Sequence, residues 1–308
     1  MRFTNDLSLP EAIVRAVTND PYDKGDADFS VTGLIAPVRA KALVARHDAE
    51  IVEDVSERLF SLYGQVGHTI LERADTDALP ERFYLTREYK GCKIIVSGRG
   101  DSLVLSDGGL LDDYKLTRVW AVMDGPKPEW IAQLNLYRLG LIECFDFVVE
   151  RLRITALLQD WMWRQAGKGK YPDRSVVALP IEVWPLAQTE AYLMERIAAH
   201  VDARSLDDAD LPECTNDERY CGKTKWAVMI PGRKSAKKLC DIKGEAEYMC
   251  EDNPTWYIEQ RGGESVRCQR YCLAGKQTSF CNQWLRIQED EAKSPLTESV
   301  EADTSAIE

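Results

Sequence analysis

The chain has 308 residues, of which 44% are hydrophobic, and a formal net charge of −12. This length allows one large hydrophobic core or two modest ones. The first residues lack the apolar segment of a signal peptide, and no apolar run reaches the length of a membrane span. These features predict a cytoplasmic protein without membrane contact and argue against a secreted disulfide framework.

The first long element predicted is an amphipathic helix over residues 51–70. Its apolar residues recur at the spacing of one buried helix face, at Ile51, Val55, Leu59, Leu62, Val66 and Ile70. Gly64 and Gly67 are expected to let a neighbouring element approach this helix, which also carries His68. A strand over residues 82–88 is predicted next, and it ends in Glu88.

A β-hairpin follows. Residues 93–96 and 102–105 are apolar and β-branched enough for buried strands, and a strand resumes at Leu110 after the turn residues 107–109. If those three residues form the loop, Asp101 pairs with Lys115, and Asp113 lies on the same face as Lys115. The hairpin therefore predicts two carboxylates and one ammonium group in one place.

This trio has the chemistry of a metal-dependent phosphodiesterase. Two carboxylates at the ends of buried strands suit Mg²⁺ or Mn²⁺, which polarises a phosphoryl oxygen and lowers the pKa of a bound water. Lys115 can orient or deprotonate that water and balance the charge on the phosphate. The alternative is that all three side chains are solvated. Asp113 favours the site, because it lies in an apolar strand where an unpaired carboxylate is costly.

The next helix is predicted over residues 128–139. Its buried stripe contains Ile131, Leu134 and Leu141, while Gln133 and Tyr137 lie one turn apart. Strands at 147–154, with one solvent-facing side, and at 176–179 follow, and then an amphipathic helix that ends near His200. The tryptophans in this region, Trp161, Trp163 and Trp184, are expected in the core, although such rings can also stack on bases.

Five of these features, in this order, resemble the RecB-like branch of the PD-(D/E)XK nuclease superfamily, which includes phage exonucleases and CRISPR-adaptation nucleases. The matching stretches are Gly64 to His68, Glu88, Gly98 to Asp101, Asp113 to Lys115 and Gln133 to Tyr137. The resemblance implies an α/β fold with a restriction-endonuclease-like core, in which helices flank a mixed central sheet.

The resemblance also implies a role for each matching residue. His68, Asp101, Asp113 and the backbone carbonyl of Tyr114 would hold the metal ion. Lys115 would act on the attacking water and Glu88 would support the site. Gln133 and Tyr137 would contact Lys115 or the DNA backbone.

Cysteines mark the second half of the chain. Seven of the nine follow residue 210, and Cys268, Cys272 and Cys281 fall within fourteen residues. Cys214 is predicted as a fourth ligand in preference to Cys221. Four thiolates suit zinc or an iron–sulfur cluster. The resemblance favours a four-iron four-sulfur cluster, with zinc and free thiols as the alternatives. The two earlier cysteines, Cys92 and Cys144, are predicted to be small buried apolar residues.

Composition divides the chain into three parts. Residues 1–205 are predicted to form the nuclease core with an N-terminal helical lead-in, residues 206–288 a cysteine-rich metal- or cluster-binding subdomain, and residues 289–308 an acidic disordered tail. Within the second part lies a basic patch of Arg233, Lys234, Lys237 and Lys238. This patch is expected either to contact DNA phosphates or to be a solvated basic face.

The sequence thus predicts a metal-dependent DNA nuclease, an exonuclease in phage or prophage recombination or repair. Its partners would be DNA and a single-strand annealing or other recombination protein. One alternative is a structure- or site-specific endonuclease. Another is a catalytically silent DNA-binding recombination partner, against which the intact Asp101, Asp113 and Lys115 argue.

Overall fold

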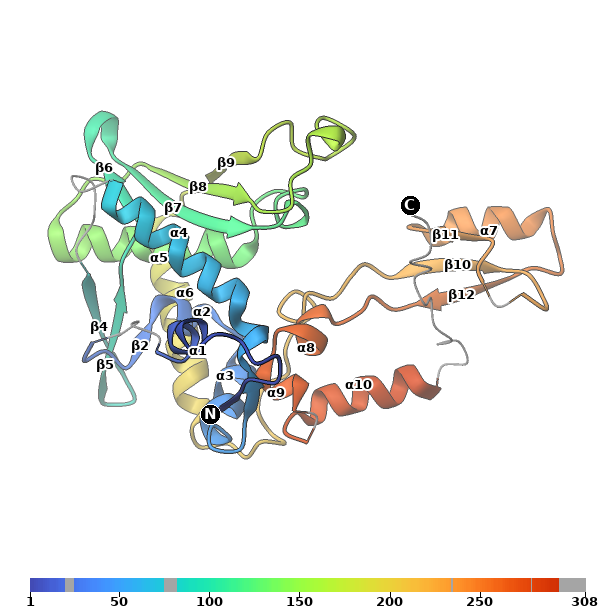
Figure 1. Ribbon diagram of the computed structural model, residues 1–308, viewed down its shortest axis with the longest axis horizontal. Helices are drawn as coiled ribbons and strands as arrows, with labels where there is room; N and C mark the ends of the chain where they lie inside the picture. Colours follow the sequence, from blue (N-terminus) through green and yellow to red (C-terminus); the bar gives the residue numbers. More distant parts are fainter. Residues whose placement is uncertain (20–24, 75–81, 234, 278, 294–308) are drawn as a thin grey trace. The chain divides into compact units, whose positions relative to one another are not determined.

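The computed structural model describes residues 1–19, 25–74, 82–233, 235–277 and 279–293. It has a mixed α/β architecture in which helices flank several sheets (Figure 1). The chain forms two compact units, Met1–Lys41 with Asp48–Ser205, and Ala42–His47 with Leu206–Glu308. The first unit ends at Ser205, as the predicted nuclease core does, but residues 42–47 of that predicted part belong to the second unit. Among the described residues, no helix combines the length and the apolarity needed to cross a bilayer.

Two sheets of the first unit position the candidate site. The smaller contains β2 (Phe29–Ser30), β5 (Cys92–Gly98) and β4 (Phe83–Tyr89), in that order. The larger contains β6 (Ser102–Val104), β7 (Leu110–Thr117), β8 (Arg151–Leu158) and β9 (Val176–Ile181). Because β7 and β8 run parallel while β6 and β9 run antiparallel to them, the larger sheet is mixed.

Helix α5 (Pro128–Phe145) is the centre of the first unit. It begins with Pro128, a residue favoured in the first helical turn, and ten of its residues are buried, Leu134 and Leu141 among them. It packs against β4, β7 and β8 and against two other helices, α2 (Val31–Ile35) and α6 (Leu186–Ala203). The helix is therefore longer than the predicted 128–139 and is covered on nearly every side.

Two glycines allow Phe83 to pack in this core. A Cβ atom at Gly98 would lie 2.4 Å from the Phe83 ring, and one at Gly140 would lie 2.3 Å from it. The fully buried ring makes an edge contact with Tyr137, at 6.0 Å between centroids. The lack of side chains at these two positions thus brings β4 and β5 close to α5.

The predicted helix over 51–70 is wrong in its first part and in its buried face. Residues Val52–Asp54 form β3, which pairs in parallel with β1 (Arg2–Thr4), and Val55–Arg58 form the 3₁₀ turn η1. The Asp54 carboxylate accepts the Ser56 N–H, which starts this turn. Helix α4 (Leu59–Ala74) begins only afterwards and has no fully buried residue. Val66 and Ile70, expected inside, are 49% and 58% exposed.

Further expectations for the first unit need correction. The strand expected at 147–154 is β8, four residues later, although its alternating burial confirms one solvent-facing side.

Cys92 and Cys144 lie on β5 and α5 as expected, but both are exposed. Nothing lies within 4 Å of a Cβ atom at Gly64, so only Gly67 serves close approach. The remaining helices of this part are α1 (Glu11–Thr18) and α3 (Val38–Arg46), whose last residues belong to the second unit.

The second unit contains a small sheet and several short helices. Strands β11 (Lys238–Cys240), β10 (Lys225–Met229) and β12 (Tyr257–Arg261) pair antiparallel in that order, and α7 (Lys243–Glu251) packs on them over Val228 and Cys240. Three helices follow, α8 (Val266–Arg270), α9 (Leu273–Lys276) and α10 (Asn282–Lys293). The predicted tail over 289–308 is wrong at its start, because α10 includes residues 289–293, and residues 294–308 lie outside the described residues.

Gly140→Ala should destabilise the protein, because its Cβ would overlap the buried Phe83 ring. Overpacking of this kind costs about 1–3 kcal/mol. Gly64→Ala is the matched control, since it is also a helical glycine but meets no neighbour, and better helix propensity should stabilise it by up to about 1 kcal/mol. Urea unfolding of both variants measures the difference. A Gly140→Ala protein as stable as Gly64→Ala would contradict this account of the packing.

Candidate active site

The turn between β6 and β7 is wider than predicted. Ser102 pairs with Asp112 and Val104 with Leu110, so residues 105–109 form the loop. Asp107 adopts a left-handed conformation with φ 52°, and the two glycines after it also have positive φ, which permits this turn. The predicted pairing of Asp101 with Lys115 is therefore wrong by two residues. Because side chains alternate with a period of two, Asp101 still points to the predicted face.

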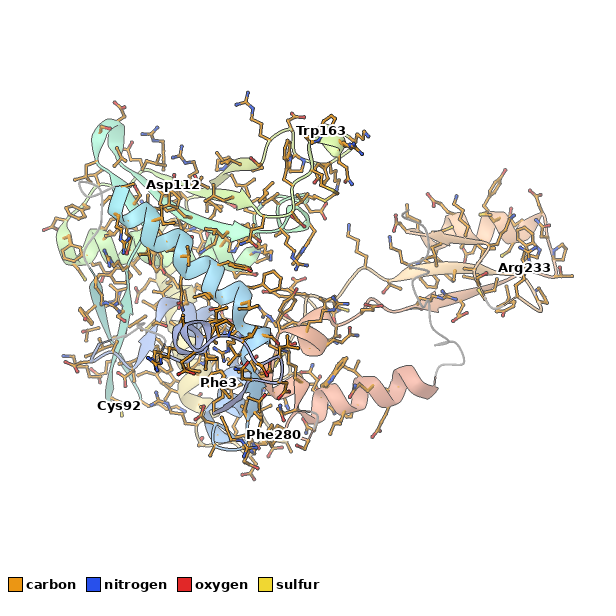
Figure 2. The ribbon with its side chains drawn as sticks, viewed as in Figure 1. Phe3, Cys92, Asp112, Trp163, Arg233 and Phe280 are labelled. Atoms are coloured by element: carbon orange, nitrogen blue, oxygen red, sulfur yellow. The ribbon has the colours of Figure 1, made fainter. Side chains whose placement is uncertain are left out.

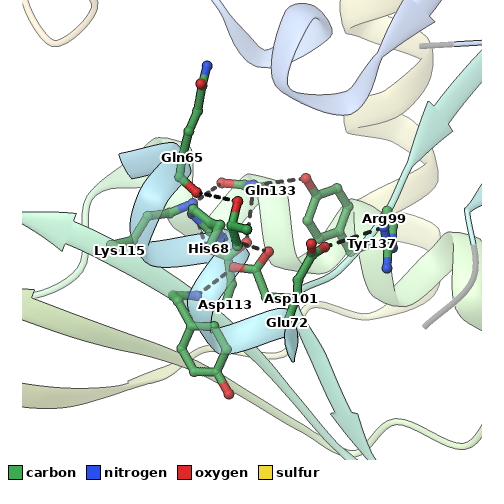
Figure 3. A network of polar contacts seen from close by, with 11 residues as sticks. Gln65, His68, Glu72, Arg99, Asp101, Asp113, Lys115, Gln133 and Tyr137 are labelled. Atoms are coloured by element: carbon green, nitrogen blue, oxygen red, sulfur yellow. Dashed lines mark hydrogen bonds and ion pairs between the residues drawn. The ribbon is translucent and has the colours of Figure 1, made fainter. Parts of the chain in front are cut away.

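Asp101 is held by the edge of β7. Since β6 begins only at Ser102, the N–H of Tyr114 lies beyond the paired part of that strand and donates to Asp101 Oδ2 at 2.7 Å. The other oxygen, Oδ1, lies 3.2 Å from Nδ1 of His68 on α4. Helix α4 reaches β7 at Gly67, where a Cβ atom would overlap Leu116. The loop before β6 and the helix thus bring a carboxylate and an imidazole to one place (Figure 3).

Asp113 is the most buried functional group of the site, with 2% of its surface exposed. Lys115 Nζ lies 2.5 Å from its Oδ2, so the two side chains form a close ion pair. Burial raises the pKa of Asp113, and Asp101 adds to this effect while Lys115 opposes it. The hydrogen bond with Asp101 raises the pKa of His68.

Gln133 connects the site to α5. Its amide nitrogen donates to Asp113 Oδ1 at 3.3 Å and to the Tyr137 hydroxyl at 2.9 Å, and its amide oxygen accepts from Lys115 Nζ at 3.1 Å (Figure 3). The contact of Gln133 with Lys115 that the resemblance implies is therefore present. The Gln133 and Tyr137 side chains, both from α5, are buried. Their burial fixes the position of the Lys115 ammonium group.

Glu88 does not belong to this site. It is exposed and pairs with Lys93, whereas Phe83, at the other end of β4, pairs with Gly98 and packs against Tyr137. The five residue steps of the extended strand from Phe83 to Glu88 span about 16 Å. The supporting role expected for Glu88 is therefore wrong, because the first residues of β4 lie beside the site and its last residues do not.

Sequence reasoning missed Glu72 and Arg99, which form an ion pair of 3.4 Å beside Asp101 (Figure 3). Glu72 follows His68 by one helical turn, so the i, i+4 spacing could have placed it on the same side of α4. Arg99 precedes Asp101 by two residues and therefore shares its neighbourhood.

The donor set suits a hard divalent cation. The Asp101 carboxylate contacts the His68 imidazole, and the Asp113 carboxylate is buried beside Lys115. In the part of the chain that the structure describes, however, no three His, Cys, Asp or Glu side chains are grouped closely enough to hold a metal ion. Asp101 pairs with His68 and Asp113 with Lys115 instead.

The four predicted cysteine ligands share one region of the second unit. Burial raises the pKa of Cys214 to about 12, and the three thiols Cys268, Cys272 and Cys281 contribute to this increase. The Gln283 amide accepts the N–H of Cys214 and donates to its carbonyl, at 2.9 and 2.8 Å, which joins the residue to the start of α10. The Cys221 thiol donates instead to the Gly263 carbonyl at 3.0 Å.

The predicted basic patch lies at the turn between β10 and β11. Arg233, labelled in Figure 2, and Lys237 and Lys238 are all exposed there. Lys234 lies outside the described residues.

The comparisons with known proteins leave the family open. No family model matches the chain, and no curated protein matches it. One solved structure with some similarity is the crystal structure of SSO0001. It is 14% identical, the match covers 60% of this chain and 81% of that chain, and the TM-score is 0.39. A similarity at this level supports no conclusion about fold or function.

Asp113→Asn should stabilise the protein at high pH in the presence of a chelator. A carboxyl whose pKa is raised by folding from 3.8 ionises more readily in the unfolded chain, so its unfavourable contribution is absent below the unfolded pKa and complete above the folded one. We expect a gain of about 1–3 kcal/mol at pH 8, which shrinks as the pH falls towards 4. Urea unfolding across this pH range measures it.

Asp112→Asn on the same strand is the control for this prediction. Asp112 is buried, and its carboxylate pairs with Arg153 and accepts the Thr155 hydroxyl. Removing its charge should destabilise the protein at pH 8, because Arg153 loses its partner. A loss of stability in Asp113→Asn at pH 8 would mean that the attraction to Lys115 outweighs burial.

Proposed function

We propose that this chain is a metal-dependent DNA nuclease of the RecB-like type, with a restriction-endonuclease-like core. The observation that carries the proposal is the buried Asp113 carboxylate, which forms an ion pair with Lys115 and lies near Asp101. The arrangement of α5 and α4 around the mixed β6–β9 sheet supports it. We infer that the enzyme is an exonuclease in phage DNA recombination or repair and acts with a single-strand annealing or other recombination protein.

The proposed ligands of Mg²⁺ or Mn²⁺ are His68, Asp101, Asp113 and the backbone carbonyl of Tyr114. When bound, such an ion polarises a phosphoryl oxygen and lowers the pKa of water. The backbone N–H of Tyr114 holds the Asp101 carboxylate in place, and burial keeps the Asp113 carboxylate from bulk water. These two residues therefore provide a fixed, partly dehydrated pair of acceptors.

Lys115 has a different task in this proposal. Its ammonium group orients the attacking water and balances the negative charge that grows on the phosphoryl oxygens as the phosphodiester bond breaks. Gln133 keeps the ammonium group in position through its amide oxygen, and the Tyr137 hydroxyl accepts from the same amide, which fixes its orientation. Gln133 and Tyr137 are thus positioning residues that act through Lys115.

In the second unit, Cys214, Cys268, Cys272 and Cys281 are proposed to hold a four-iron four-sulfur cluster or, alternatively, zinc. What supports the proposal is that Cys268 and Cys281 are buried, Cys214 and Cys272 are half-buried, and the other three thiols act on the pKa of Cys214, although no three of the four are grouped closely enough in the described residues to hold a metal. The exposed Arg233, Lys237 and Lys238 would contact phosphates, and their positive charge opposes the net charge of the whole chain.

Asp113→Ala, Lys115→Ala and Asp101→Ala should each abolish divalent-dependent DNA cleavage while the protein stays folded. End-labelled linear, nicked and closed circular DNA incubated with Mg²⁺ or with Mn²⁺ measures this, and an exonuclease degrades only the substrates with ends. Asp112→Asn, on the opposite face of β7, and Glu88→Ala should retain cleavage. Near wild-type turnover in folded Lys115→Ala protein would refute the assignment.

Cys272→Ala should release a metal or cluster from the second unit and loosen residues 210–284 before the first unit melts. The free energy of binding a structural metal stabilises the folded state of a segment that has little apolar core. Protein purified without oxygen should be brown with broad visible absorption for iron–sulfur, or colourless with one zinc ion per chain. Cys92→Ala and Cys144→Ala are controls that keep the metal content. Wild-type protein with neither iron nor zinc would overturn this site.

A further inference from the structure

Exposed aromatic side chains surround the end of the strands that carry the candidate site. The parallel strands β7 and β8 end together, with Thr117 paired to Leu158, so the segments 118–127 and 159–175 leave the sheet at the same edge. Lys115 lies only two residues before this edge. A ligand that extends from Lys115 past the strand ends therefore meets these two segments.

Trp163 is the most exposed of these rings. It was expected in the core, but 72% of its surface is accessible, and Figure 2 shows it on the outside of the loop after β8. The loop itself is ordered by internal contacts, because the Trp161 indole donates to the Pro172 carbonyl at 2.9 Å and the Tyr171 hydroxyl accepts the Met162 N–H at 2.7 Å. These contacts hold the loop in a conformation that exposes the Trp163 ring.

Each of three exposed rings has a cationic side chain over its face. The Arg118 guanidinium lies 4.7 Å from the ring centre of Phe60, the Lys127 ammonium 4.5 Å from that of Trp120, and the Arg164 guanidinium 5.5 Å from that of Trp163. Phe60 and Trp120 are 57% and 48% exposed. We call these six residues the stacking surface.

Contacts between the two segments hold the stacking surface together. The Asp160 carboxylate accepts the Val119 N–H at 2.7 Å, and Lys170 pairs with Asp124 at 2.5 Å. Residues 159–175 carry four Lys or Arg and two Asp, in a chain of net charge −12. The loop after β8 therefore carries a net charge of +2, opposite in sign to that of the whole chain.

We propose that the stacking surface binds single-stranded DNA on its way to Lys115, a substrate class that rests on the proposed nuclease function. Rings that alternate with cations match a strand in which bases alternate with phosphates. Bases of a duplex are stacked on each other and cannot cover these rings without leaving the helix. A protein partner would use the rings but has no need for a cation beside each one. Single-stranded DNA therefore uses all six residues.

Binding of a fluorescein-labelled oligothymidine, followed by fluorescence anisotropy with a chelator present, tests the proposal apart from cleavage. Stacking of one base is worth about 1–3 kcal/mol, so Trp163→Ala and Trp120→Ala should each weaken binding between about fivefold and about a hundredfold. Trp163→Phe should retain most of the affinity, because a ring remains. A blunt-ended duplex should bind more weakly than the single strand and respond little to these variants.

Tyr84→Ala is the matched control, because Tyr84 is a 45% exposed ring on β4 of the same unit. It should leave the affinity unchanged, and thermal unfolding verifies that all variants are folded. Unchanged oligothymidine binding in folded Trp163→Ala and Trp120→Ala proteins, or equal losses for single strand and duplex, would overturn the stacking surface. Loss of binding in these variants together with no cleavage by the wild type would sustain the surface and refute the nuclease proposal.

Discussion

The burial of one carboxylate, that of Asp113, constrains the rest of the first unit. An ionised group in the interior is unfavourable unless charge and hydrogen bonds compensate for the lost water. Lys115 from the same strand and Gln133 from α5 supply part of that compensation, and Gln133 is itself held by Tyr137. The strand and the helix must therefore keep a fixed register. The glycines beside Phe83 serve that register, since they let β5 and α5 approach the same ring.

The parts of the site that the sequence predicts well are those governed by short periods. Asp113 and Lys115 share a face because strand side chains alternate, and Gln133 and Tyr137 share one because helical neighbours recur every four residues. Both relations survive small errors in the element boundaries. The proximity of Cys214 to the later cysteines is different, since it depends on Gln283 and on contacts distant in sequence.

The predictions that were wrong depend on contacts between residues distant in sequence. The apolar spacing of Ile51 and Val55 fits a helix, but these two residues flank β3. The pairing of β3 with β1 buries both of them in the core without a helix. Burial of Cys92 was inferred from residue type alone, and a position at the start of a hairpin strand exposes it. The predicted burial of Trp163 was also inferred from residue type. The long loop after β8 has its own internal contacts and leaves this ring exposed to solvent.

The wide turn between β6 and β7 has a consequence for the tolerance of this hairpin to insertions and deletions. Asp101 is fixed by the backbone N–H of Tyr114 and not by the number of residues in the loop. Lengthening or shortening the loop between Val104 and Leu110 leaves that contact intact as long as the strand register is kept. Homologous chains with loops of different length here can therefore share one carboxylate geometry, and motif searches that demand a fixed spacing between the two aspartates would miss them.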